Sequence, residues 1–106
     1  MLTDDDSEVH LDITVADGAD GEGVRLALSG DLDLGGAAEL ESRLGDLGEL
    51  VGSVVIDLSG VEFIDSSGIR TLIIARTQHS SRLVEPSRAV LHTFEVANVL
   101  HLLEEA

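Results

Sequence analysis

The chain has 106 residues, 43% of them hydrophobic, and 21 acidic side chains against six arginines and no lysine give a formal net charge of −15. This length predicts a single domain with one core, and the charge argues against direct binding to nucleic acid or to an anionic membrane surface. Cysteine is absent, which excludes disulfides, thiol catalysis and thiolate metal sites.

The acidic segment 1–8 predicts a disordered terminus, and residues 9–106 are expected to form the single domain. The start of the chain lacks the basic and apolar regions of a signal peptide, and no apolar run approaches the roughly 20 residues of a membrane span. We therefore expect a cytoplasmic protein. Val9–Val15 and Val24–Leu28 alternate apolar and polar residues, and Asp-Gly pairs between them predict a hairpin with a long tip.

Gly30–Gly35 is predicted to be a loop that leads into a helix, and Gly45 and Gly48 are expected to weaken and end that helix. Its inward face has apolar residues at helical spacing, namely Ala37, Leu40, Leu44 and Leu47. Ser53–Leu58 is dense in valine and isoleucine, which predicts a central, parallel strand that is buried on both faces.

The second half of the chain predicts alternating helices and strands. Ser67–Gln78 has the pattern of a helix, Arg82–Val84 of a short strand, Pro86-Ser87 of a helix start, and Val99–Leu103 of a last amphipathic turn. The residues expected to face the core from the two helices are Ile69, Leu72, Ile73, Val90, Leu91 and Phe94. The element order predicts an α/β domain with a mixed sheet of four to five strands and helices mainly on one side.

The junction between the predicted central strand and the second helix is the most informative segment, Ile64-Asp65-Ser66-Ser67-Gly68-Ile69. A helix start offers free backbone N–H groups to an anion, and the serine hydroxyls there are open to modification. Asp65 or Ser66 is expected to cap the helix. Since no base or other nucleophile activator lies nearby in the sequence, we interpret the junction as a switch site and not as a catalytic one.

Enzyme chemistry finds little support in the sequence. The four histidines have no metal-ligand spacing, the absence of lysine rules out a Walker-type phosphate loop, and Gly-x-Ser-x-Gly is absent. Two phenylalanines cannot line an aromatic sugar cleft. We therefore expect a binding protein with no catalytic residue, metal or cofactor.

Three segments in order along the chain resemble a known family. Residues 55–68 (VIDLSGVEFIDSSG) closely resemble the signature of STAS domains, in particular of single-domain anti-sigma factor antagonists. Leu28–Asp33 resembles the Gly-acidic-Leu-Asp segment of that family, and Leu83–Val90 resembles its short strand followed by a Pro-Ser helix start. Two departures are that Gln78–Val84 is short and lacks the usual glycine pair, and that Val96-Ala97-Asn98 replaces a common glycine turn.

The resemblance implies a STAS-like fold and a bacterial phosphoprotein that regulates transcription through protein–protein interaction. Ser67 would be phosphorylated by an anti-sigma factor with serine kinase activity. The unphosphorylated chain would bind that partner and release its sigma factor, and a PP2C-type phosphatase would restore this form. The resemblance places Asp33 beside the modified serine, and the expected partner-binding surface comprises Asp31, Asp33, Asp65, Ser66, Ser67 and Gly68.

Two other functions stay open at this point. A STAS binding subunit of a lipid-transport or signalling-scaffold complex would use the same surface without needing phosphorylation, and co-purification with a membrane complex would favour it. A small enzyme or nucleotide binder is the third candidate, which calorimetry with nucleoside triphosphates would address.

Overall fold

Four strands form one mixed sheet in the computed structural model, which describes residues 9–17, 23–47 and 53–104. They are β1 (Leu11–Asp17), β2 (Val24–Leu32), β3 (Val54–Ile64) and β4 (Arg82–Val84). In the order β1-β2-β3-β4, β1 pairs antiparallel with β2, whereas β3 is parallel to both of its neighbours. The predicted hairpin and the predicted central, parallel strand are therefore confirmed. The predicted disordered segment 1–8 and most of the hairpin tip lie outside the described residues.

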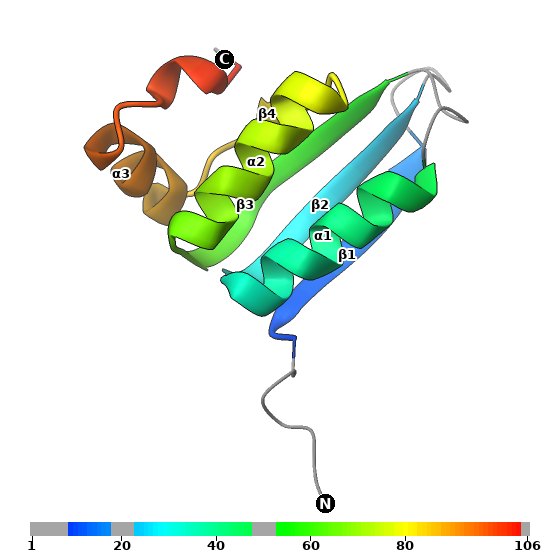
Figure 1. Ribbon diagram of the computed structural model, residues 1–106, viewed down its shortest axis with the longest axis horizontal. Coiled ribbons are helices and arrows are strands. Elements are labelled where there is room, and N and C mark those ends of the chain that lie inside the picture. Colours follow the sequence, from blue (N-terminus) through cyan, green and yellow to red (C-terminus); the bar gives the residue numbers. More distant parts are fainter. Residues whose placement is uncertain (1–8, 18–22, 48–52, 105–106) are drawn as a thin grey trace, which may run out of the picture.

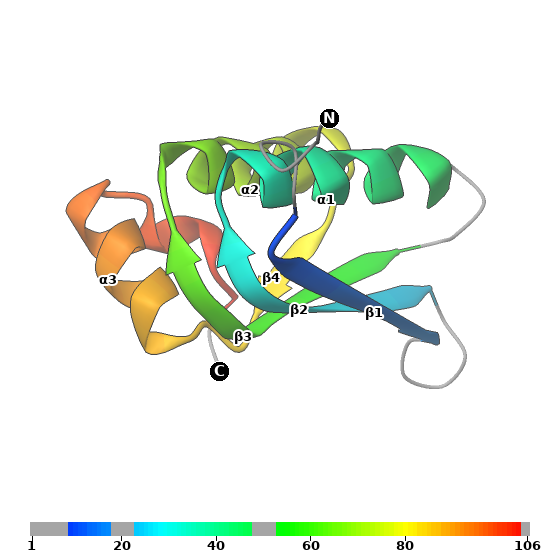
Figure 2. The same ribbon diagram turned by 90° about the horizontal axis from the view of Figure 1, so that it is seen from below.

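Two helices cover one face of this sheet. These two are α1 (Leu34–Leu47) and α2 (Ser66–Gln78), and the described residues also form α3 (Arg88–Val96) and a 3₁₀ turn at Leu100–Leu102. Figures 1 and 2 show α1 and α2 side by side over the same face, with α3 on the opposite side of α2 from α1. The predicted α/β architecture, with a mixed sheet and helices mainly on one side, is confirmed.

The core lies between the sheet and α1 and α2. Alternate residues of β2 and β3 point toward the helices and are fully or almost fully buried, among them Leu26, Leu28, Ile56 and Leu58. Helices α1, α2 and α3 contribute buried side chains to this core, namely Ala37, Leu40, Leu44, Leu72, Val90 and Phe94. Because complete burial of one such leucine stabilises the fold by about 1.5–3 kcal/mol, this layer fixes how α1 and α2 lie on the sheet.

The segment Gly30–Leu32 belongs to β2, so the prediction of a loop there was wrong. The strand continues past two irregularities in its register with β3, one of them between Gly30 and Asp31. Gly30 has a φ of +111°, and a Cβ at this position would lie 2.3 Å from the carbonyl oxygen of His10. The glycine therefore permits the close approach of β1 to a distorted strand and does not mark a turn.

Two predicted inward positions were also wrong. Leu91 is 43% exposed on α3. On α2 the buried residue next to Leu72 is Thr71, while Ile73 is only partly buried.

At the end of the chain the predicted amphipathic turn is a 3₁₀ turn, after which the Glu104 N–H donates to the Leu83 carbonyl at 2.8 Å. Leu103 thereby forms an isolated parallel β-bridge with Leu83 of β4.

The face of β3 opposite the core is only partly buried, contrary to the prediction, and in Figure 2 no helix of the described residues lies over it. This face carries an ion pair between the Arg25 guanidinium and the Asp57 carboxylate at 2.9 Å. Burial alone would raise the pKa of Asp57, but hydrogen bonds from Ser59 and from Arg25 and the positive charge of Arg25 outweigh it, so that this pKa lies below its ordinary value.

A consequence is that Asp57→Asn should lower the free energy of unfolding at neutral pH by about 1 kcal/mol, a modest value because Arg25 is substantially exposed. Since the folded-state pKa of Asp57 is depressed, its stabilising effect is complete above the unfolded-state value near 3.8 and disappears as the pH falls through the folded-state value. Urea unfolding at neutral and acidic pH, with the exposed Asp12→Asn as the charge control, measures this. A difference between wild type and Asp57→Asn that persists at the lowest pH would contradict it.

Candidate functional site

The carboxyl ends of β2 and β3 lie next to each other and start the two helices that cover the sheet. Leu32 and Ile64 are partners in the parallel register. The residues that follow them, Asp33 and Asp65, therefore occupy equivalent positions, and α1 and α2 begin at the same edge of the sheet (Figure 1).

Both aspartates cap the helix that they precede. The Asp33 Oδ1 accepts from the Gly36 N–H at 3.0 Å, and the Asp65 Oδ1 accepts from the N–H groups of Ser67 at 2.9 Å and Gly68 at 3.2 Å. Each carboxylate thereby satisfies backbone donors that a helix start leaves without partners. The expected free N–H groups of Ser67 and Gly68 are thus occupied, so an anion cannot bind them without displacing Asp65.

The two caps belong to a repeated motif, Asp-x-x-Gly, at residues 33–36 and 65–68. A Cβ on Gly36 would lie 2.5 Å from the Asp31 carbonyl oxygen, and a Cβ on Gly68 would lie 2.3 Å from the Leu32 carbonyl oxygen. Both glycines therefore allow a helix to approach the strand behind it. The repeat was missed in the sequence, although its Asp-to-Gly spacing is visible there.

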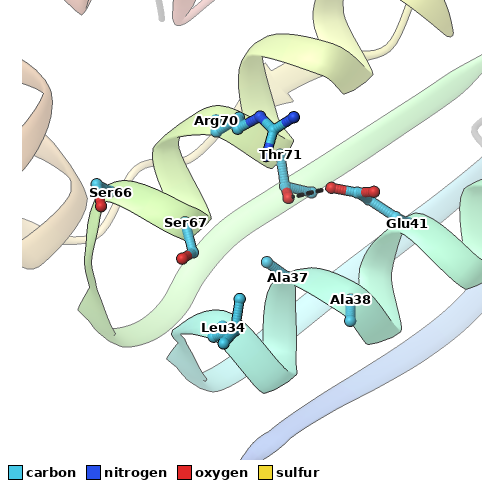
Figure 3. A pocket seen from close by; sticks show the side chains of 8 residues that line it. All are labelled: Leu34, Ala37, Ala38, Glu41, Ser66, Ser67, Arg70 and Thr71. Carbon is cyan, nitrogen blue, oxygen red and sulfur yellow. Dashed lines mark hydrogen bonds between the residues drawn. The ribbon is translucent and has the colours of Figure 1, made fainter.

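An open groove of about 470 Å³ lies between the N-terminal halves of α1 and α2 (Figure 3). Its lining includes Leu34, Ala37, Glu41, Ser67, Arg70 and Thr71. The small side chain of Ala37 leaves space between the helices, whereas Leu34 is 73% exposed at the groove. The groove thus combines the exposed side chain of Leu34 with serine hydroxyls and an arginine.

A hydrogen bond joins the helices within this groove. Thr71 is only 1% exposed, and its hydroxyl donates to the Glu41 carboxylate at 2.6 Å (Figure 3). A buried hydroxyl without such a partner would destabilise the fold by about 1–3 kcal/mol, so the bond helps to hold α1 and α2 at their present separation.

The predicted site residues differ in how they are placed. Ser66 is exposed and Ser67 partly exposed, and both line the groove, while Asp33 and Asp65 are partly exposed caps at the starts of its two helices. Asp31 is partly exposed on β2, and Gly68 is buried, so that its position serves packing. Partner binding by these residues stays a prediction.

The sequence analysis missed three features of the groove, which are Leu34, Arg70 and the Thr71–Glu41 pair. Only the packing of α1 beside α2 brings these residues to one groove.

The described residues contain no cluster of three or more side chains suited to holding a metal ion. Within the same part of the chain, no helix has the length and apolar character that crossing a bilayer would require.

The sequence matches a family model described as "Mlab, STAS domain" over residues 15–104. No curated protein matches the sequence. Among solved structures, the unphosphorylated anti-sigma factor antagonist SpoIIAA has a TM-score of 0.69 at 18% identity, with 90% of this chain and 88% of that chain covered.

The phosphorylated form of SpoIIAA from Bacillus has a TM-score of 0.63 at 17% identity, covering 90% of this chain and 91% of that one. An uncharacterised DUF3478 protein from Shewanella loihica, described as having a SpoIIAA-like fold, has a TM-score of 0.54 at 12% identity and covers 83% of this chain and 76% of that one. At such identities these likenesses establish a shared fold.

Proposed function

Because the chain belongs to the STAS domain family, we propose that it is an anti-sigma factor antagonist whose docking is switched by phosphorylation of Ser67. The unphosphorylated form binds an anti-sigma factor with serine kinase activity and releases the sigma factor. Phosphorylation blocks that binding, and a PP2C-type phosphatase reverses it. The protein acts by binding and not by catalysis, in the cytoplasm of a bacterium.

The observation that carries this proposal is the place of Ser67. Its hydroxyl belongs to a partly exposed residue in a groove between two helix starts, beside the exposed Leu34. A kinase can reach such a hydroxyl, and a partner can bury the leucine next to it. Similarity to solved structures of both the unphosphorylated and the phosphorylated form of SpoIIAA supports a switch that leaves this fold intact.

In the proposed transfer, the Ser67 oxygen attacks the γ-phosphorus of ATP, ADP leaves, and a base of the kinase takes the hydroxyl proton. The product carries roughly 1.5 to 2 additional negative charges and three strong acceptors. Because Asp65 already occupies the N–H groups of Ser67 and Gly68, the phosphate stays outside the helix end, close to the Asp65 carboxylate. Bulk, charge repulsion and desolvation at the groove then oppose docking.

The net charge of −15 favours a partner with a basic docking face, since complementary charge accelerates association and suppresses wrong partners. Against so large a charge, one phosphate changes the overall field little. The switch therefore acts through local contacts at the groove.

The test compares Ser67→Ala, Ser67→Asp and Ser66→Ala in binding to the cognate anti-sigma factor. We expect Ser67→Ala to bind like the unmodified chain and to escape phosphorylation, and Ser67→Asp to bind about tenfold more weakly, which corresponds to 1.4 kcal/mol. Ser66→Ala is the neighbouring control, and mass spectrometry after incubation with the kinase and ATP should still find phosphate on Ser67.

Phosphate on Ser66, or equal affinity of Ser67→Ala and Ser67→Asp, would contradict the switch. Equal affinity together with recovery of a membrane complex from cells would favour the STAS subunit of a lipid-transport or scaffold complex.

A further inference from the structure

Arg70 has no ion-pair or side-chain hydrogen-bond partner among the described residues, although the chain is strongly acidic. Three other arginines form ion pairs, with Asp57, Glu39 and Glu104, and Arg76 donates to the carbonyl of Leu102. Arg88 on α3 also lacks such a partner within the described part of the chain. Of these two unpaired cations, only Arg70 lines the groove that contains Ser67.

Ser67 and Arg70 are three residues apart on α2, so their side chains leave the same side of the helix. Residues at this spacing have Cβ atoms about 5–6 Å apart, which a guanidinium on its flexible stem can span. Its planar fork of donors matches two oxygens of a phosphate. In Figure 3 the guanidinium does not point toward Ser67, so contact requires the side chain to swing toward the start of α2, a direction that long helical side chains favour.

A phosphate on Ser67 would need new donors at this place. The nearest backbone donors are held by Asp65, and the carboxylates of Asp33 and Asp65 would repel it. Glu41, which also lines the groove, already accepts the Thr71 hydroxyl and adds a further negative charge. Arg70 is thus the cation among the described groove residues that is available to compensate a phosphate.

We propose that Arg70 is the internal counter-ion of the Ser67 phosphate and folds back onto it along α2. The inference relies on the proposed function only for the identity of the modified serine. In the unmodified chain Arg70 is available to an acidic group of the partner. After phosphorylation Arg70 pairs with the phosphate on Ser67, and this ion pair occupies the mouth of the groove. The partner then meets a bulky phosphate and can no longer bind the Arg70 guanidinium.

The test uses phosphoserine incorporated at position 67 during translation, so that no kinase is needed. The second ionisation of the phosphate is followed by ³¹P NMR in the otherwise unchanged chain and in Arg70→Gln, Arg70→Lys and Arg88→Gln. We expect Arg70→Gln to raise the second pKa of the phosphate by roughly 0.5 unit, because a nearby cation favours the dianion, and Arg70→Lys to restore part of the difference.

Arg88→Gln removes the same charge from α3 and should leave the titration unchanged, and 1 M salt should reduce the effect of Arg70→Gln. Identical titrations of the parent and Arg70→Gln, or an equal shift in Arg88→Gln, would overturn the assignment of Arg70. Neither result bears on whether a kinase modifies Ser67, and a kinase that modifies another residue would overturn the proposed function without changing this titration.

Discussion

Replacing Gly68 by alanine is expected to lower the free energy of unfolding by about 3 kcal/mol, because the added methyl group has no room. It would lie 2.3 Å from the Leu32 carbonyl oxygen and 2.8 Å from a side-chain carbon of Ile64. The oxygen belongs to the backbone of β2 and cannot move without disturbing the sheet, so α2 must shift instead. Urea unfolding followed by circular dichroism gives the change.

Gly45→Ala is the matched control, since it makes the same chemical change in the neighbouring helix. A Cβ at Gly45 has no heavy atom within 4 Å, and the residue is exposed on α1. Alanine there should raise the free energy of unfolding by about 0.5–1 kcal/mol, because it favours the helix over the unfolded chain. Equal effects at both positions would contradict the close approach of α2 to β2 as the reason for a glycine at position 68.

Replacing Leu34 by serine is expected to weaken binding of the proposed anti-sigma factor about 30-fold, because burial of a leucine at an interface contributes about 2 kcal/mol. Leu34 is 73% exposed at the first position of α1 and lines the same groove as Ser67. Since its side chain lies outside the core, the change should leave the fold intact. Isothermal titration with the unphosphorylated chain measures the affinity, and circular dichroism verifies folding.

Val96→Ser is the control for the loss of an exposed apolar side chain. Val96 is 74% exposed at the end of α3, which α2 separates from α1 (Figure 1). It should bind like wild type. A Leu34→Ser chain that keeps full affinity, or a Val96→Ser chain that loses as much, would mean that the partner docks elsewhere than on the groove.

Much of the fold could be predicted from the sequence because its signals are local. Period-two alternation identified β1 and the first part of β2, helical spacing identified the inward face of α1, and the Pro-Ser pair located the start of α3. The errors occurred where a residue's role depends on a neighbour distant in sequence. Leu91 fits an inward helical position by spacing, but it is 43% exposed in the fold, since where α3 rests depends on the other elements.

The candidate site divides in the same way. Ser66 and Ser67 could be singled out because small polar residues between a strand and a helix are visible in one stretch of sequence. Capping of that helix by Asp65 or Ser66 was predicted, and Asp65 is the residue that caps it. Leu34 and Arg70 could not, because nothing local relates the start of α1 to the first turns of α2. Their place in one groove follows from the parallel pairing of β2 with β3.

By itself, the sequence determined the order of the elements, the acidic charge of the molecule and the serine at a helix start, since each depends on neighbouring residues or on a sum over the chain. Only the tertiary structure decided that the Thr71 hydroxyl donates to Glu41 across the two helices, and that Gly30 and Gly68 serve close approaches of backbones. The physical reason is that a side-chain rotamer or a steric gap is set by atoms from several segments at once, and their meeting depends on packing that no single segment encodes.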